Sequence, residues 1–214
     1  MVMKFGDAKG VPQKTSGKDV APSQTRHSAG FEQFCSVLQT SQNLSILDMA
    51  GVSQANISFI TEFGHRISSD DIIGTMQQSF GSDFFESQQT DSTAHRFLEQ
   101  TLTFPEESFD GALVWDALQL LVPPVLEEVV ARLLRVMRPG GIILAFFNSD
   151  EKASRMPIYN YRIQNSKTLL QIPRGGSQPA QCFNNRTLEK LFEHASSLKF
   201  FLTRDSLREV IVRK

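Results

Sequence analysis

Blocks of apolar residues along the chain repeat first with the spacing of a helix and then with that of a buried strand. The first helical block is Phe31, Phe34, Cys35 and Leu38, which predicts a short amphipathic helix. Residues 45–50 are mostly apolar and predict a strand, and Ser53 is a suitable N-cap for a helix over residues 54–63. Gly64 would end that helix before a second short strand over residues 66–69. This order predicts a strand-helix-strand unit.

The middle of the chain is less regular. Residues 72–100 are polar, interrupted by glycines and helical in pattern only at their two ends, so no third strand is placed there. Beyond them, residues 109–115 and residues 142–147 predict strands, and their nearly continuous apolar composition is typical of strands covered on both faces. Between these strands an amphipathic helix, closed by Pro139-Gly140-Gly141, is indicated by Val125, Leu126, Val129, Val130, Leu133, Val136 and Met137.

The last third predicts a hairpin, a loop, one helix and two closing strands. The hairpin covers residues 159–163 and 168–172, and the loop residues 173–179. The helix covers residues 186–195, and the closing strands residues 200–203 and 207–212. The connection between the closing strands is too short for a parallel crossover, so these two strands must pair antiparallel. Strands that otherwise alternate with helices predict an α/β fold with a doubly wound sheet.

Composition narrows the class of protein. A chain of 214 residues fits one domain, in which residues 1–30 form a flexible polar tail and residues 31–214 the folded unit. A net charge of −1 without a basic run argues against nucleic-acid binding. No apolar stretch approaches the ~20 residues of a membrane helix, and no signal peptide is recognisable, so a cytoplasmic protein is expected. Cys35 and Cys182 are expected to be reduced and buried, and the scattered histidines indicate no metal site.

Two turns carry a resemblance to a known family. They are Leu102-Thr-Phe-Pro-Glu-Glu-Ser-Phe-Asp-Gly-Ala-Leu-Val-Trp-Asp-Ala-Leu118, which leads into one predicted strand, and Arg135-Val-Met-Arg-Pro-Gly-Gly141, which leads into the next. The chain from Phe31 onward thereby resembles the class I S-adenosylmethionine-dependent methyltransferases of the type 11 group. The resemblance implies a Rossmann-like, seven-stranded mixed sheet with helices on both faces, in which only the last strand of the chain runs antiparallel.

The resemblance also implies where S-adenosylmethionine would bind. The family's acid-x-Gly-x-Gly-x-Gly turn falls on Asp48-Met-Ala-Gly-Val-Ser-Gln54, in which Asp48 matches and the glycine positions hold Ala50, Val52 and Gln54. A β-branched Val52 at a position with positive φ would be strained and would face the cofactor. Gly51 offers a turn shifted by one residue. The alternative is a plain strand-to-helix turn in a relative that no longer binds the cofactor.

Two further acids match family positions. A carboxylate after the second strand of this family accepts the two ribose hydroxyls, and Asp71 fits that role better than Asp70. The alternative is that both acids cap the helix that follows. The family position of the acid that binds adenine aligns near Leu98. Glu99 could bind adenine only if this alignment shifts by one residue.

The remaining candidates lie after later strands. Trp115 could offer a flat wall to adenine or substrate, or belong to the core. Asp116 is the candidate general base, with a solvated or capping acid as the alternative. Tyr159 and Tyr161 lie where the family recognises its acceptor, or they pack across the hairpin.

These assignments predict a methyltransferase that moves a methyl group from S-adenosylmethionine to an unidentified small-molecule acceptor. The reaction is an in-line displacement that depends mainly on positioning, so a missing catalytic signature excludes nothing. A methyltransferase-like binding module without the cofactor is the alternative, and a nucleotide-sugar or dinucleotide enzyme is a weaker third. No nucleic acid or membrane partner is expected, and the oligomeric state stays open.

Overall fold

The computed structural model describes residues 22–81, 84–203 and 205–214. Its main sheet has six strands in the order β3-β2-β4-β5-β9-β8. Their bounds are Arg66–Ser69 (β3), Ser45–Asp48 (β2), Phe109–Trp115 (β4), Met137–Asn148 (β5), Leu207–Arg213 (β9) and Ser197–Leu202 (β8). The first four run parallel, and β9 alone is reversed, pairing antiparallel with β5 and β8. The expected doubly wound α/β class and the antiparallel closing pair are therefore confirmed.

The expected seventh strand is absent from the described residues, so the sheet is one strand narrower than predicted. Between β3 and β4 the described residues form three helices, Ile72–Phe80 (α3), Phe84–Ser87 (α4) and Asp91–Gln100 (α5). Leu102, in the short link before β4, has a φ of 54°, which interrupts extended backbone there. The sheet therefore ends at β3 on this side.

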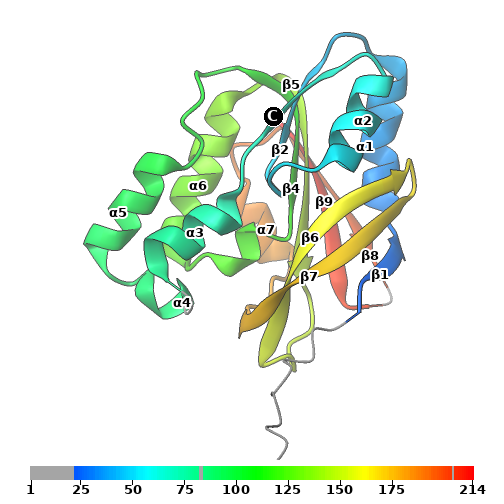
Figure 1. Ribbon diagram of the computed structural model, residues 1–214. Helices are drawn as coiled ribbons and strands as arrows, with labels where there is room; N and C mark the ends of the chain where they lie inside the picture. The colour runs from blue at the N-terminus through cyan, green and yellow to red at the C-terminus, as the bar shows by residue number, and fades with distance from the viewer. Residues whose placement is uncertain (1–21, 82–83, 204) are drawn as a thin grey trace, which may run out of the picture.

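Helices cover both faces of the main sheet (Figure 1). Ala29–Thr40 (α1) and Gln54–Glu62 (α2) lie on one face. On the other face lie α3, α5, Pro123–Val136 (α6) and Asn185–Leu191 (α7). Each face has its own apolar core, because consecutive strand residues point to opposite sides of the sheet. The predicted stripe of α1 is confirmed, since all of its members are buried: Phe31, Phe34, Cys35 and Leu38.

A second sheet of three strands crosses the face that carries α1 and α2 (Figure 1). It consists of Gln24–His27 (β1), Arg155–Asn165 (β6) and Thr168–Pro179 (β7) in the order β1-β7-β6. The predicted hairpin is confirmed and is longer than expected. Residues 173–179 were predicted as a loop, yet they belong to β7 and pair with β6 as far as Arg155 and Pro179. Polar composition did not prevent pairing, because backbone groups alone form the ladder.

The N-terminal region differs from the predicted tail. Residues 1–21 lie outside the described residues, but β1 pairs with β7 along its whole length. Ser28 then caps α1 by accepting a hydrogen bond from the backbone N–H of Phe31. Residues 24–30 are therefore part of the fold. The prediction failed because their polar composition gives no local strand signal, and their pairing with β7 is a long-range interaction.

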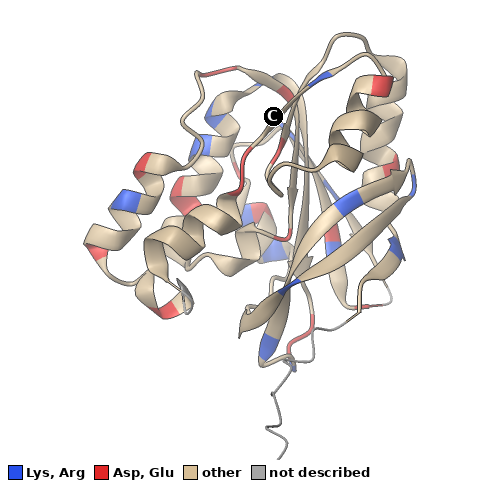
Figure 2. Cartoon of the chain, in the orientation of Figure 1, with Lys and Arg blue, Asp and Glu red and all other residues tan. Residues whose placement is uncertain are grey.

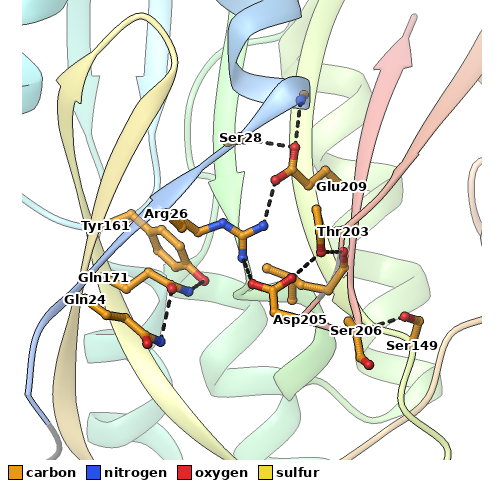
Figure 3. Close-up of polar contacts among 12 residues, drawn as sticks. Gln24, Arg26, Ser28, Ser149, Tyr161, Gln171, Thr203, Asp205, Ser206 and Glu209 are labelled. Atoms are coloured by element: carbon orange, nitrogen blue, oxygen red, sulfur yellow. Dashed lines mark hydrogen bonds and ion pairs between the residues drawn. The ribbon is translucent and has the colours of Figure 1, made fainter.

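A buried carboxylate ties this N-terminal region to the last strand (Figure 3). Glu209, on β9, has no exposed surface and accepts hydrogen bonds from Arg26 (2.7 Å), from the hydroxyl of Ser28 (2.9 Å) and from the backbone N–H of Gly30 (2.6 Å). A second ion pair joins Arg26 to Asp205 at 3.0 Å. Because the carboxylate is fully hydrogen-bonded, its burial is tolerated.

Three surface features complete the description. Basic and acidic positions are interspersed on α5, α6 and α7, whereas α1 and α2 carry one acidic position each and neither Lys nor Arg (Figure 2). Cys35 is buried as expected, but Cys182 is exposed, and neither forms a disulfide. Along the described ranges, none of the helices combines the length and the apolar composition needed to cross a membrane.

The buried ion pair predicts a large loss of stability in Glu209→Gln. The amide keeps the shape but removes the charge opposite Arg26, whose remaining partner Asp205 is half exposed. We expect the free energy of unfolding in urea to fall by about 3 kcal/mol. Glu32→Gln is the matched control, because Glu32 joins α1 to Lys167 in the exposed end of the hairpin and should change nothing measurable. Equal losses in both variants would contradict the prediction.

Candidate functional site

Three adjacent parallel strands end at the same edge of the main sheet, and polar residues follow each of them. β2 ends at Asp48, β3 is followed by Asp70 and Asp71, and β4 by Asp116. The backbone turn after β2 reaches the end of β3, because Ala50 forms a bridge with Asp71. This edge of an α/β sheet is where ligands of such folds bind.

Asp48 is the most enclosed of these acids. One oxygen accepts hydrogen bonds from the indole N–H of Trp115 (2.7 Å) and the backbone N–H of Ala50 (3.1 Å), and the other accepts from the amide of Asn56 (2.6 Å). Burial raises the pKa of Asp48, although these three donors favour the charged form. The carboxylate is therefore fully used by the protein's own groups and organises the turn after β2.

The turn itself corrects the expectation of strain at Val52. Positive φ, at 82°, occurs at Gly51, while Val52 is absent from the residues with positive φ and its side chain is 84% exposed. A Cβ at Gly51 would lie 3.2 Å from the Cβ of Asp71. The glycine is thus required one position earlier than the family pattern places it, which agrees with the predicted shifted turn. Ser53 is the N-cap of α2 by position, but its side chain makes no cap hydrogen bond.

Asp71 has two partners at once. Its Oδ1 accepts from the backbone N–H of Gly74 (2.9 Å), so Asp71 caps α3 as the helix-capping alternative expected of both acids. Arg174 of β7 also binds it with both guanidinium nitrogens, at 2.7 and 2.9 Å. Burial opposes ionisation of Asp71, but these hydrogen bonds outweigh it and lower its pKa. The neighbouring Asp70 differs, because burial raises its pKa.

Asp116 is buried directly after β4, and its Oδ1 has no hydrogen-bond partner among the described residues. Burial raises its pKa to about 7, although a hydrogen bond from Tyr161 and the charges of Arg26 and Arg174 act in the opposite direction. A buried carboxyl that titrates near neutral pH and keeps one oxygen unsatisfied has the properties of a general base.

The aromatic candidates lie together in the core. Trp115 and Tyr161 are buried and stack in parallel, with ring centroids 5.2 Å apart, and Phe146 contacts both rings. The core alternative for Trp115 therefore describes this structure, in which the indole also holds Asp48. Tyr159 is half-buried and meets Tyr161 edge to face, which is the packing alternative for the hairpin.

Glu99 is the one cofactor candidate that the structure places away from the others. It lies on α5, is largely exposed, and pairs with His95 one helical turn earlier at 3.2 Å. The residues around Leu98 and Glu99 form a helix here, which turns the side chain of Glu99 toward solvent.

Sequence reasoning missed three residues of this region: Asn56, Gln171 and Arg174. Asn56 is buried on α2 and donates to both Asp48 and the backbone carbonyl of Tyr161. A polar residue one turn before the buried Ile60 was the available signal. For Gln171 and Arg174 no local signal existed, because their partners lie in other elements.

Two sizeable cavities lie away from these strand ends. One, of about 580 Å³, lies between α6 and α7 and includes Leu126, Phe183 and Leu191. Another, of about 470 Å³, lies at the opposite edge of the sheet beside Ser45, Arg66 and Arg138. At the carboxyl edge the side chain of Asp71 stays 41% exposed and the turn at Gly51 is not covered by Val52. A ribose fits the chemistry of Asp71, provided that Arg174 shares or leaves this carboxylate.

Several solved structures are similar to this chain at low identity. The 1,6-didemethyltoxoflavin-N1-methyltransferase of Burkholderia thailandensis, with bound 1,6-didemethyltoxoflavin and S-adenosylhomocysteine, is 14% identical over 87% of this chain and 78% of that one, with a TM-score of 0.47. An S-adenosylmethionine-dependent methyltransferase of Mesorhizobium loti is 12% identical over 87% and 98%, with a TM-score of 0.49. One from Archaeoglobus fulgidus is 13% identical over 87% and 92%, with a TM-score of 0.48. No curated protein matches.

A family model matches the central part of the chain. Residues 47–145 match the family described as a methyltransferase domain. The segment extends from β2 into β5 and contains Asp48, Gly51, Asp71 and Asp116, together with the two turns that carry the resemblance. The order of the strands in this segment is that of a doubly wound sheet. Residues 47–145 of this chain are therefore similar to the methyltransferase domain family.

Proposed function

We propose that the protein transfers a methyl group from S-adenosylmethionine to a small-molecule acceptor at the carboxyl edge of β2, β3 and β4, beneath the hairpin of β6 and β7. The observation that carries this proposal is the buried carboxyl of Asp116, which follows β4 and has one unpartnered oxygen. A side chain of this kind has a use in removing a proton from an acceptor, and burial without such a use costs stability.

Each residue of the edge has a separate part in this proposal. Asp71 would accept the ribose hydroxyls, and the left-handed Gly51 would let the backbone approach the ligand. When bound, the cofactor supplies an electrophilic methyl group on a sulfonium. Asp48 acts through structure, since its hydrogen bonds fix the turn that contains Gly51. Asp116 takes the proton that the acceptor loses.

Access to Asp116 depends on the hairpin. Asp116 and Tyr161 are both buried, so an acceptor reaches the carboxyl only when the part of the hairpin around Arg174 moves, while the part that Asn56 holds stays in place. Arg174 links the hairpin to the edge of the sheet through its two hydrogen bonds to Asp71. Gly175 and Gly176 follow Arg174 with φ of 82° and 76°, and the backbone next to Arg174 therefore carries no side chains at these two positions. Binding of a ribose at Asp71 would compete with Arg174 and loosen this link.

A binding module without the cofactor is the second candidate, and a specific observation favours it. Both acids that would organise the cofactor are already engaged, Asp48 by Trp115 and Asn56, and Asp71 by Arg174. A protein that had lost its ligand could fill the site in this way. The two candidates differ in one measurable property, which is affinity for S-adenosylmethionine.

Calorimetric titration should show that the wild type binds S-adenosylmethionine and S-adenosylhomocysteine, and that Asp71→Asn weakens both. Loss of hydrogen bonds to a charged acceptor predicts a roughly tenfold or greater loss of affinity. Asp70→Asn is the matched control, because its neighbour carries the ribose contact in this proposal. Absence of binding by the wild type would favour the module, and equal effects of the two variants would remove the ribose role of Asp71.

Arg174→Gln should raise the affinity for S-adenosylmethionine by about tenfold, because Asp71 then loses a competing ion pair. The gain should be larger for S-adenosylmethionine than for S-adenosylhomocysteine, since the variant also removes a positive charge near a cationic sulfonium. Arg162→Gln, at an exposed position of β6, is the control and should bind as the wild type does. A lower affinity in Arg174→Gln would instead identify this guanidinium as a ligand of the cofactor.

The raised pKa of Asp116 predicts a pH-dependent stability. The folded protein holds this proton up to about pH 7, whereas the unfolded chain releases it near 3.8, so stability falls as the pH rises through this window. Relative to Asp116→Asn, the wild type should lose roughly 3 kcal/mol of unfolding free energy between pH 4 and pH 7. Urea midpoints measured across this range test it. Parallel curves for the two proteins would show that Asp116 ionises normally.

A further inference from the structure

A row of polar side chains runs across the second sheet from Gln24 through Gln171 to Tyr161 (Figure 3). The amide of Gln24 donates to the carbonyl oxygen of the Gln171 side chain at 3.3 Å, and the amide of Gln171 donates to the hydroxyl of Tyr161 at 3.2 Å. Tyr161 in turn hydrogen-bonds to Asp116. The phenolic oxygen accepts a hydrogen bond from Gln171, and this leaves the hydroxyl hydrogen of Tyr161 to point at Asp116.

The phenol cannot easily turn away from this arrangement. Its ring lies parallel to that of Trp115, with an angle of 2° between the planes. The backbone on either side is held by Asn56, whose amide donates to the carbonyl of Tyr161 at 3.2 Å and whose oxygen accepts from the N–H of Ile163 at 2.8 Å. Ring, hydroxyl and backbone are therefore all fixed before any ligand arrives.

We propose that Tyr161 is a positioning residue for Asp116: it donates a hydrogen bond to one oxygen of the carboxylate and leaves Oδ1 as the oxygen that takes a proton from the methyl acceptor. This inference rests on the proposed function and deepens it. It names the acceptor class, since a base positioned in this way serves a group that must lose a proton. The acceptor therefore presents an O–H or an N–H, whose proton does not leave unaided near neutral pH, whereas a thiol, with a pKa of about 8.5, ionises with less help.

The groups that act on Asp116 come from all three strands of the second sheet. Arg26 on β1 and Arg174 on β7 favour the carboxylate, and a hydrogen bond from Tyr161 on β6 does the same. Tyr159 and Tyr161 are in turn affected by Asp116, whose charge contributes to raising the pKa of both phenols, after burial as the main cause. With Tyr161 kept protonated, only the carboxyl is able to act as the base.

The proton balance of the step is simple. The acceptor's O–H or N–H bond breaks and its proton goes to Oδ1 of Asp116. The electron pair left on the acceptor forms the new bond to carbon, while the pair of the carbon–sulfur bond stays on sulfur. Tyr161 keeps its own proton throughout and stabilises the carboxylate before the transfer.

The chain's single tryptophan, Trp115, gives a direct probe, because it is next to Asp116 in sequence and stacked on Tyr161. Its fluorescence should titrate near pH 7 in the wild type, and Asp116→Asn should abolish the transition. Tyr161→Phe should move the midpoint up by about one pH unit, because a hydrogen bond to the charged form is lost. Gln171→Met should cause a smaller shift in the same direction.

Tyr159→Phe is the matched control, since it removes the hydroxyl of the neighbouring tyrosine while sparing the bond to Asp116. Its midpoint should equal that of the wild type. An unshifted midpoint in both Tyr161→Phe and Gln171→Met, or an equal shift in Tyr159→Phe, overturns the positioning role. These titrations need no cofactor, so they are independent of whether the wild type binds S-adenosylmethionine.

The kinetic arm tests the use of the base. In Tyr161→Phe, kcat for methyl transfer to an O–H or N–H acceptor should fall, with KM for the cofactor unchanged and with the pH profile displaced by the same amount as the fluorescence midpoint. A change in KM alone contradicts a positioning role. A wild type that binds the cofactor but methylates only thiols or carbon overturns the acceptor class.

Discussion

The buried side-chain amide of Asn56 joins the two sheets, and the geometry of the candidate site depends on it. Its nitrogen donates to Asp48 at the end of β2 and to the carbonyl of Tyr161 in the hairpin, and its oxygen accepts from the backbone of Ile163. An amide is suited to this position because it is both donor and acceptor in one plane. The turn that follows β2 and the phenol that faces Asp116 are consequently set by one residue of α2.

The two buried acids of this edge illustrate how environment separates roles. Asp48 and Asp116 both follow or end neighbouring parallel strands, and burial raises the pKa of each. Both oxygens of Asp48 accept hydrogen bonds from the protein, so this carboxylate has a structural role only. Asp116 retains an oxygen without a partner. A difference in hydrogen bonding, and not in burial, divides a structural carboxylate from one that is available for chemistry.

The sequence predicted those parts of the fold whose signal is local. Apolar periodicity located α1, α6 and the strands from β2 to β9, and the acids at the ends of β2 and β3 followed from their position after a strand. It failed for β1, for the second half of β7 and for the edge of the main sheet, where polar residues form strands or an expected strand is replaced by helix. Arg174 and Gln171 were not predictable, because their partners are distant in sequence, as for Arg174 and Asp71, which are 103 residues apart.

The reversed strand β9 has a consequence for the order in which the protein can be assembled during synthesis. Arg26 is buried against Glu209, and 183 residues separate them in the chain. A ribosome must therefore complete β9 before the guanidinium of β1 has its buried counter-charge, and β5 before that point lacks its neighbour on one side. The early part of the nascent chain therefore stays without its buried partner, and open to chaperones, until β9 has left the ribosome.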